Sequence, residues 1–158
     1  MIEIFNELLK VESNSILLLV GVGEKEDEIK NKIDELGIKD KVRFLGNRSD
    51  VCELYQAMDV FVLPSLFEGI PVVGVEAQFS DLPCLFSDKT PEEVRFDDRS
   101  QFIGLDVSAN EWAKKILETK NLIRSGVRNE IKNSYYDIKN SHSVLETYYV
   151  ELYRSLKV

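Results

Sequence analysis

Short apolar runs alternate with segments of helical periodicity, and this alternation restricts the fold more than any other feature of the chain. An uninterrupted apolar run of this length is typical of a parallel strand that is buried on both faces. Strands that alternate with amphipathic helices predict an α/β fold, in which right-handed crossovers build a parallel sheet flanked by helices. The expected strands are residues 16–20, 42–45, 60–63 and 83–86, with a last edge strand at 102–105.

Helix signals fill the intervals between these strands. Apolar residues recur at helical spacing from Ile2 onward, so a helix is expected at the start of the chain. Ser49 is expected to cap the helix that precedes residue 60. Ser108 and Glu111 have the spacing of a capping box, which predicts a helix after the last strand. Two more helices are expected to follow, with His142 in an exposed loop before the final one.

The size and charge of the chain narrow the classes of function. With 158 residues, it is expected to form a single domain over residues 1–158. A net charge of −8 argues against a nucleic-acid-binding protein, which normally presents a basic face. No apolar run approaches the roughly 18 residues of a membrane span and no secretory signal is visible, so a cytoplasmic location is expected. Cys52 and Cys84 are expected to be buried free thiols.

The most informative chemical pattern is the run SLFEGIPVVGVEA. Pro71 is suited to the first position of a helix, because proline has no N–H to leave unpaired there. The N–H groups of Val72 and Val73 would then point out of the helix N-terminus, which is a ready site for an anion. Glu68 and Glu76 place one carboxylate on each side of this turn. A ligand with both phosphates and hydroxyls, such as a nucleotide-sugar, would suit this arrangement.

The same run resembles the E-x7-E signature of the retaining GT-B glycosyltransferases of group 1, also called family 4, because Glu68 and Glu76 have its spacing. The resemblance covers nearly the whole chain. It implies a Rossmann-like domain, the C-terminal donor-binding half of a GT-B fold, and is closest to bacterial capsular and exopolysaccharide enzymes. Further matching segments are LLLVGVGE at 17–24, KVRFLG at 41–46, LYQAMDVFVLPS at 54–65 and LPCL at 82–85.

The resemblance also implies roles for individual residues. Glu76 would accept hydrogen bonds from the ribose hydroxyls of the nucleotide. Glu68, the expected catalytic residue, would bind hydroxyls of the donor sugar. The other expected donor-binding residues are Gly69, Ile70, Pro71, Val72 and Val73 at the turn, Gly21 below the nucleotide, and Leu45, Gly46, Asn47 and Arg48 beside the base.

Each of these assignments has a plain structural alternative that the sequence leaves open. Glu68 could simply be favoured by the dipole at a helix N-terminus, and Glu76 could lie on a solvated face of that helix. Gly21 could be part of an ordinary strand-to-helix turn, and Arg48 could be an ordinary surface cation. A dinucleotide fingerprint is a poor interpretation, because Glu26 occupies the place of its third glycine. A glycosidase-like acid and base pair is disfavoured, since both carboxylates lie on one turn and the helix after it. No metal and no cofactor are implied, and the UDP- or GDP-linked donor is a substrate.

Relatives in the family begin this domain with a strand that ends in Gly-Arg and a loop with a Lys, both before the helix expected at residues 2–10. They also carry an N-terminal domain that binds the acceptor. The sequence is therefore expected to be a fragment that is inactive by itself. The additional strand would be central, so the gap should be closed by direct pairing of its neighbours, by a partner chain or by a missing peptide. Exposed strand edges also favour self-association.

The function implied by the resemblance is donor binding in an enzyme of cell-surface polysaccharide biosynthesis. That enzyme would transfer a hexose from a nucleotide-sugar to a saccharide or lipid-linked acceptor, at the inner face of the membrane. Three alternatives remain open from the sequence. The first is a non-catalytic nucleotide-sugar-binding module, and the second is a fragment of a UDP-sugar epimerase with the GT-B fold. The third is a purely structural scaffold domain that has lost its ligand.

Overall fold

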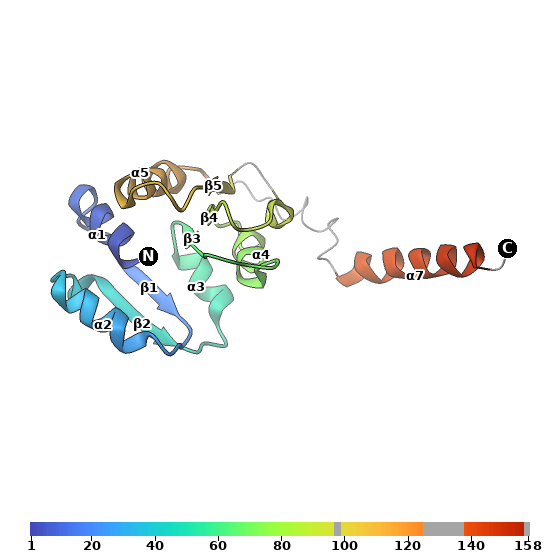
Figure 1. Ribbon diagram of the computed structural model, residues 1–158, viewed down its shortest axis with the longest axis horizontal. Helices are drawn as coiled ribbons and strands as arrows, with labels where there is room; N and C mark the ends of the chain where they lie inside the picture. Colours follow the sequence, from blue (N-terminus) through green and yellow to red (C-terminus); the bar gives the residue numbers. More distant parts are fainter. Residues whose placement is uncertain (97–98, 125–137, 157–158) are drawn as a thin grey trace.

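Strands and helices alternate through most of the chain, and Figure 1 shows an α/β body with the helix α7 standing apart from it. The computed structural model describes residues 1–96, 99–124 and 138–156. The elements in chain order are α1 (Ile2–Val11), β1 (Leu17–Val20), α2 (Glu26–Glu35), the 3-10 turn η1 (Lys39–Lys41), β2 (Val42–Gly46), α3 (Val51–Ala57), β3 (Phe61–Leu63), α4 (Val72–Phe79), β4 (Cys84–Ser87), the 3-10 turn η2 (Glu92–Val94), β5 (Gln101–Ile103), α5 (Ala109–Lys120) and α7 (Ile138–Ser155).

The strands form two parallel sheets. β1 pairs with β2, while β3, β4 and β5 pair in that order, and every pairing is parallel. Within the described residues β1 and β3 do not pair with each other, although residues of both strands line the same cavity. The expected α/β fold with parallel strands is confirmed, as is the edge position of β5. Direct pairing of the neighbouring strands, one of the three ways in which the gap was expected to be closed, does not occur within the described residues.

One apolar cluster joins α1 and α5 to the β1–β2 sheet. Phe5 on α1 and Trp112 on α5 are each 2% exposed. Full burial of a side chain such as Phe5 contributes about 1.5–3 kcal/mol. The indole N–H of Trp112 donates to the carbonyl of Gly104 at 3.1 Å, so its polar atom is paired. Lys120 Nζ lies 2.6 Å from Glu12 Oε2, which joins the ends of the same two helices.

A second apolar cluster surrounds β4, whose residues are all buried. This burial on both faces explains why the strand has a continuous apolar run instead of an alternating one. The ring of Phe86 lies 6.2 Å from that of Phe61 on β3 and 5.5 Å from that of Phe102 on β5. The three strands of this sheet are therefore joined by aromatic contacts as well as by their backbone hydrogen bonds.

The helix α4 packs unusually close to β4 because it carries a glycine at the contact. A Cβ atom on Gly74 would lie 2.7 Å from Cε1 of Phe86. After the helix, Asp81 adopts a φ of 60°, in the left-handed region, and the chain turns into β4. The Asp81 carboxylate lies 2.6 Å from the Arg99 guanidinium, and the two side chains are only 13% and 14% exposed. This ion pair joins the turn to the segment before β5.

The helix starts differ in how well the sequence predicted them. The capping box is confirmed: Ser108 Oγ accepts from the N–H of Glu111, whose carboxylate accepts from the N–H of Ser108. The expected cap at Ser49 is wrong, because α3 begins one residue later, with Asp50 as its N-cap. Asp50 does not cap through its side chain either, because Arg48 occupies its carboxylate.

Three further expectations concern single residues and the last helices. Cys84 is buried as expected, but Cys52 is exposed, because it lies on the outer face of α3. His142 lies within α7 and not in a loop before it, although it is exposed as expected. Of the two further helices that were expected, the last is α7, and residues 125–137, which lie between α5 and α7, are outside the described residues.

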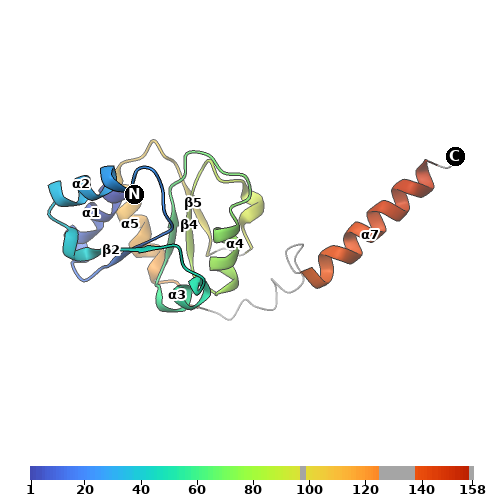
Figure 2. The same ribbon diagram turned by 90° about the horizontal axis from the view of Figure 1, so that it is seen from below.

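The helix α7 stands apart from the α/β body in both Figures 1 and 2. Its side chains are largely exposed, including the rings of Tyr148 and Tyr149, which are 58% and 63% exposed. Nowhere in residues 1–96, 99–124 and 138–156 is a helix both long enough and apolar enough to cross a membrane.

We expect Gly74→Ala to lower the free energy of unfolding by about 1–3 kcal/mol, because the new methyl group would overlap the buried ring of Phe86. The control is Gly23→Ala, where the added Cβ meets nothing within 4 Å. This control should change stability by less than about 0.5 kcal/mol. Urea unfolding followed by circular dichroism measures both variants. Equal stability of the two would contradict the close packing of α4 on β4.

Candidate functional site

A cavity of about 940 Å³ lies between the two sheets and reaches the turns that follow β1 and β2. Open parallel sheets bind ligands at the carboxyl ends of their strands, so this end of the cavity is the candidate site. The structure brings part of the predicted site together there. The predicted residues that line the cavity are Gly21, Asn47, Arg48, Val73 and Glu76.

The other predicted residues lie beside the cavity and do not line it. Glu68 is half-buried in the loop between β3 and α4, and Gly69 and Ile70 next to it are exposed. Leu45 and Gly46 are half-buried at the end of β2. The two signature carboxylates therefore differ in position: one belongs to the cavity wall and the other to the loop outside it.

Two glycines close the end of the β1–β2 sheet. The N–H of Gly21 donates to the carbonyl of Gly46 at 2.8 Å. Their φ angles of 114° and 59° lie in the region that only glycine adopts easily. This geometry explains both glycines as parts of a tight turn, and it also removes side chains from the rim where a ligand would enter.

The N-terminus of α4 exposes free backbone donors, as predicted, although the helix begins one residue later than predicted. Pro71 is the N-cap, and its carbonyl accepts from the N–H groups of Gly74 and Val75 at 2.9 and 3.2 Å. Val72 and Val73 are therefore the first two helical residues, whose N–H groups have no acceptor within the helix. Both residues are exposed, so these N–H groups remain available to an anion.

Tyr55 is a residue of this site that the sequence did not single out. It lies on α3, is 3% exposed and lines the same cavity as Glu76. Its hydroxyl donates to the carbonyl of Val73 at 3.3 Å. Burial, together with the negative charge of Glu76, raises the pKa of Tyr55 to about 12. A tyrosine on the buried face of a helix needs a partner for its hydroxyl, and this requirement is the feature of the sequence that could have pointed to Tyr55.

Arg48 is the cation at the rim, and Asp50 already binds it. Its Nε and one terminal nitrogen donate to the two carboxylate oxygens at 2.7 and 2.5 Å. These hydrogen bonds are the main cause that lowers the pKa of Asp50. The side chains are 41% and 36% exposed, so the pair adds little to stability. An anion in the cavity would compete with Asp50 for this guanidinium.

A buried glutamine fixes the far side of α4. Gln78 is 1% exposed and has partners for both ends of its amide. Its nitrogen donates to the carbonyls of Gly74 and Val94 at 3.0 and 2.7 Å. Its oxygen accepts from the N–H of Phe96 at 3.0 Å and from Ser100 Oγ at 2.7 Å. Since Glu76 lies two residues earlier on the same helix, these bonds help to fix the position of its backbone.

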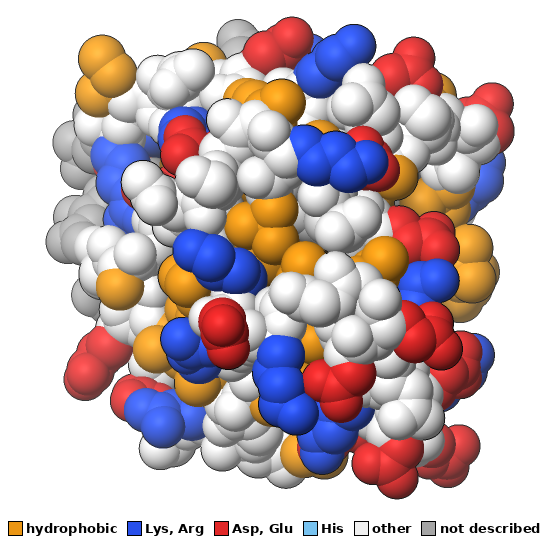
Figure 3. All heavy atoms as spheres, turned by 90° about the vertical axis from the view of Figure 1, so that its left-hand side faces the viewer, with side chains coloured by type: hydrophobic (Ala, Val, Ile, Leu, Met, Phe, Trp, Pro, Cys, Tyr) orange, Lys and Arg blue, Asp and Glu red, His pale blue; other side chains and the backbone are white. Residues whose placement is uncertain are grey.

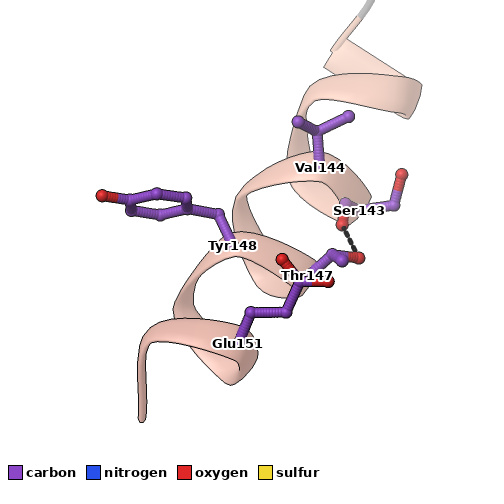
Figure 4. A pocket seen from close by; sticks show the side chains of 5 residues that line it. All are labelled: Ser143, Val144, Thr147, Tyr148 and Glu151. Carbon is purple, nitrogen blue, oxygen red and sulfur yellow. Dashed lines mark hydrogen bonds between the residues drawn. The ribbon is translucent and has the colours of Figure 1, made fainter. Parts of the chain in front are cut away.

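The rest of the described surface offers no comparable combination of a carboxylate and free backbone donors beside a cavity. Figure 4 shows a shallow depression on α7, lined by five side chains of this one helix, and its one drawn hydrogen bond joins Thr147 to the carbonyl of Ser143. Among the residues that the structure describes, no three or more His, Cys, Asp or Glu side chains are placed to hold a metal ion. The face in Figure 3 carries basic and acidic side chains side by side, with hydrophobic atoms between them.

The fold and the cavity define a class of protein: a parallel α/β domain with a cavity at the carboxyl ends of its strands. A family model makes this more specific, since residues 1–132 match the one described as "Glycosyl transferases group 1". The chain belongs to this family, and the prediction made from the sequence is confirmed.

Named relatives agree with this assignment. The chain is 30% identical over 144 residues to the UDP-Gal:alpha-D-GlcNAc-diphosphoundecaprenol alpha-1,3-galactosyltransferase of Escherichia coli, covering 85% of the chain and 37% of the relative. It is 33% identical over 84 residues to the amylovoran biosynthesis glycosyltransferase AmsD of Erwinia amylovora, covering 52% and 24%. The structure of a mutant of S. aureus TarM in complex with fondaparinux, alpha-GlcNAc-glycerol and UDP has the same fold, with a TM-score of 0.79, 21% identity, and coverage of 92% and 31%. The chain thus spans less than two fifths of each of these proteins.

Proposed function

We propose that this chain binds the nucleotide-sugar donor of a retaining hexosyltransferase, and that the cavity between its sheets is the donor site. One observation carries the proposal: Glu76 and the first turn of α4 lie in the same cavity as the turns that follow β1 and β2. A carboxylate beside free backbone N–H groups matches a ligand that carries both hydroxyls and phosphates. The names of the galactosyltransferase relative and of the TarM complex, which both include UDP, support a uridine nucleotide.

Each part of the ligand has a proposed partner. The carboxylate of Glu76 accepts from the ribose hydroxyls, and the backbone at Val72 and Val73 receives the diphosphate. Glu68, in the loop outside the cavity wall, is proposed to bind the sugar that projects from the diphosphate. Arg48 lies beside the base and exchanges Asp50 for the ligand. The proposal includes no metal and no cofactor, because helix N–H groups stabilise the developing charge of the leaving diphosphate.

The complete enzyme is proposed to act in cell-surface polysaccharide biosynthesis, including capsule formation, on the cytoplasmic side of the membrane. Its acceptor would be a saccharide or a lipid-linked saccharide bound by a further domain. The name of the E. coli relative, which includes a diphosphoundecaprenol-linked sugar, and that of the amylovoran enzyme support this choice. In this proposal the described chain contributes the donor site alone.

We expect UDP or GDP to bind the chain saturably and to move the amide NMR signals of residues 69–76 and 45–48. Glu76→Gln should weaken this binding about ten-fold, because hydrogen bonds to a charged acceptor contribute about 1.5–3 kcal/mol. Glu93→Gln is the matched control, since it removes the same charge from an exposed position on η2. No shifts at millimolar nucleotide, or equal affinity of both variants, would contradict the proposed site.

We expect the 158-residue chain to bind the donor without transferring the sugar. Arg48, the cation beside the turn that follows β2, is already paired with Asp50, and the acceptor is proposed to bind elsewhere. The measurement is the release of nucleotide from UDP-galactose in the presence of saccharide acceptors, with the heat-treated chain as the control. Turnover above that control would show that the chain holds a complete catalytic site.

We expect the free edges of β1 and β3 to make the chain self-associate at high concentration, because unpaired strand edges are templates for pairing. Light scattering behind size-exclusion chromatography, over a range of concentrations, measures this. Val20→Lys places a charge on the edge of β1 and should restore the monomer. Val11→Lys, on the exposed end of α1, is the matched control and should not. A monomer at every concentration would refute the expectation.

A further inference from the structure

One buried hydroxyl anchors the start of the loop that carries Glu68. The backbone pairing of β3 with β4 ends at the residue before Ser87. Ser87 is fully buried, and its Oγ donates to the carbonyl of Ser65 at 2.6 Å. Within the described residues, no other hydrogen bond involves residues 65–70. The side chain of Ser87 therefore continues the connection between the two strands where their backbone ladder stops.

The neighbours of the Ser87 hydroxyl leave its proton one destination. The N–H of Lys89 donates to Ser87 Oγ at 3.4 Å, and the hydroxyl oxygen of Thr90 lies 3.4 Å from the same atom. A serine hydroxyl has one proton to donate and two lone pairs that accept. The much shorter contact, to the carbonyl of Ser65, takes the proton, while Lys89 and Thr90 approach the lone pairs. The hydroxyl is thus oriented toward Ser65.

The preceding residue of β4 anchors the other end of the same loop. The ring of Phe86 lies against Gly74, in the first turn of α4. Between the two anchors, Leu66 and Phe67 are 84% and 87% exposed, so their packing does little to hold the loop. The side chain of Glu68 has no hydrogen bond or ion pair within the described residues. The position of its carboxylate therefore depends on where the ends of the loop are fixed.

We propose that Ser87 is a positioning residue for Glu68: its hydroxyl fixes the start of the β3–α4 loop, and through it the part of the site that recognises the sugar of the donor. This role rests on the proposed function of the cavity. A binding carboxylate must be held within about half an ångström of its working position. The nucleotide is assigned to Glu76 and the first turn of α4, which Gly74 and Gln78 hold in place. Ser87 therefore acts on recognition of the sugar and not on that of the nucleotide.

The test compares the affinities for UDP and for a UDP-hexose, measured by calorimetry with the full 158-residue chain. The UDP-hexose is UDP-galactose or UDP-glucose, whichever the wild-type chain binds more tightly. Ser87→Ala removes the hydroxyl, and we expect it to weaken UDP-hexose binding about five-fold and to leave UDP binding unchanged. In a Glu68→Gln background the same change should have almost no further effect, because the carboxylate to be positioned is gone.

Two further variants make the comparison specific. Thr119→Val is the matched control, since it also removes a fully buried hydroxyl that donates to a backbone carbonyl, that of Lys115 at 2.8 Å. Thr119 lies on α5 and does not line the cavity, so both affinities should stay unchanged. Ser87→Cys keeps the size of the side chain but has only a weak donor, so it should act in the same direction as Ser87→Ala and replaces it if that variant does not fold. Urea midpoints confirm that each variant is folded.

The outcomes separate this role from the proposed function. If the wild-type chain binds neither UDP nor a UDP-hexose, the proposed function is wrong and the role of Ser87 falls with it. If it binds UDP but no UDP-hexose, the nucleotide site stands and the role of Ser87 is wrong. If the Ser87 variants bind both ligands as the wild type does, only the positioning role is wrong. If they weaken both ligands equally, or act equally with and without Glu68, the effect is a general one on structure and the positioning role is also overturned.

Discussion

The close contact between α4 and β4 determines where the candidate site lies. Gly74 allows the helix to approach the ring of Phe86 more closely than any residue with a side chain would permit. The amide of Gln78 then fixes the helix to the segment between Val94 and Ser100 through three hydrogen bonds. Interiors pack tightly and deform little, so this contact sets the position of the helix N-terminus and of Glu76. The site is thus built on a rigid element, with only Glu68 left in a loop.

The separation of the strands into two sheets gives the molecule its cavity. The edges of β1 and β3 both face this space, and neither edge is paired within the described residues. Unpaired backbone groups that are shielded from water are costly, so this arrangement favours any further strand that can donate and accept there. At the carboxyl end of the strands the same space becomes the candidate ligand site. Completion of the sheet and ligand binding are therefore expected to influence each other.

An anionic ligand on an acidic chain requires local attraction. The net charge of −8 opposes the approach of a diphosphate, and the one guanidinium on the described rim is paired with Asp50. The N–H groups at the start of α4 act over short distances and are independent of the overall charge. The specificity of such a site depends on geometry more than on the electrostatic field of the whole protein.

The sequence by itself determined the element order, the parallel class of the sheets and the turn that exposes Val72 and Val73. These follow from local rules: apolar periodicity, proline and glycine geometry, and the capping box at Ser108. Local rules failed at Ser49 and Cys52, where a shift of one residue or the choice of helix face depends on neighbours that are distant in the chain. Only the tertiary structure decided that Glu76 lines the cavity while Glu68 does not, and that Tyr55 from α3 belongs to the site. Each of these depends on how helices pack across the sheet. Packing joins residues far apart in sequence, and no local pattern encodes the distance between them.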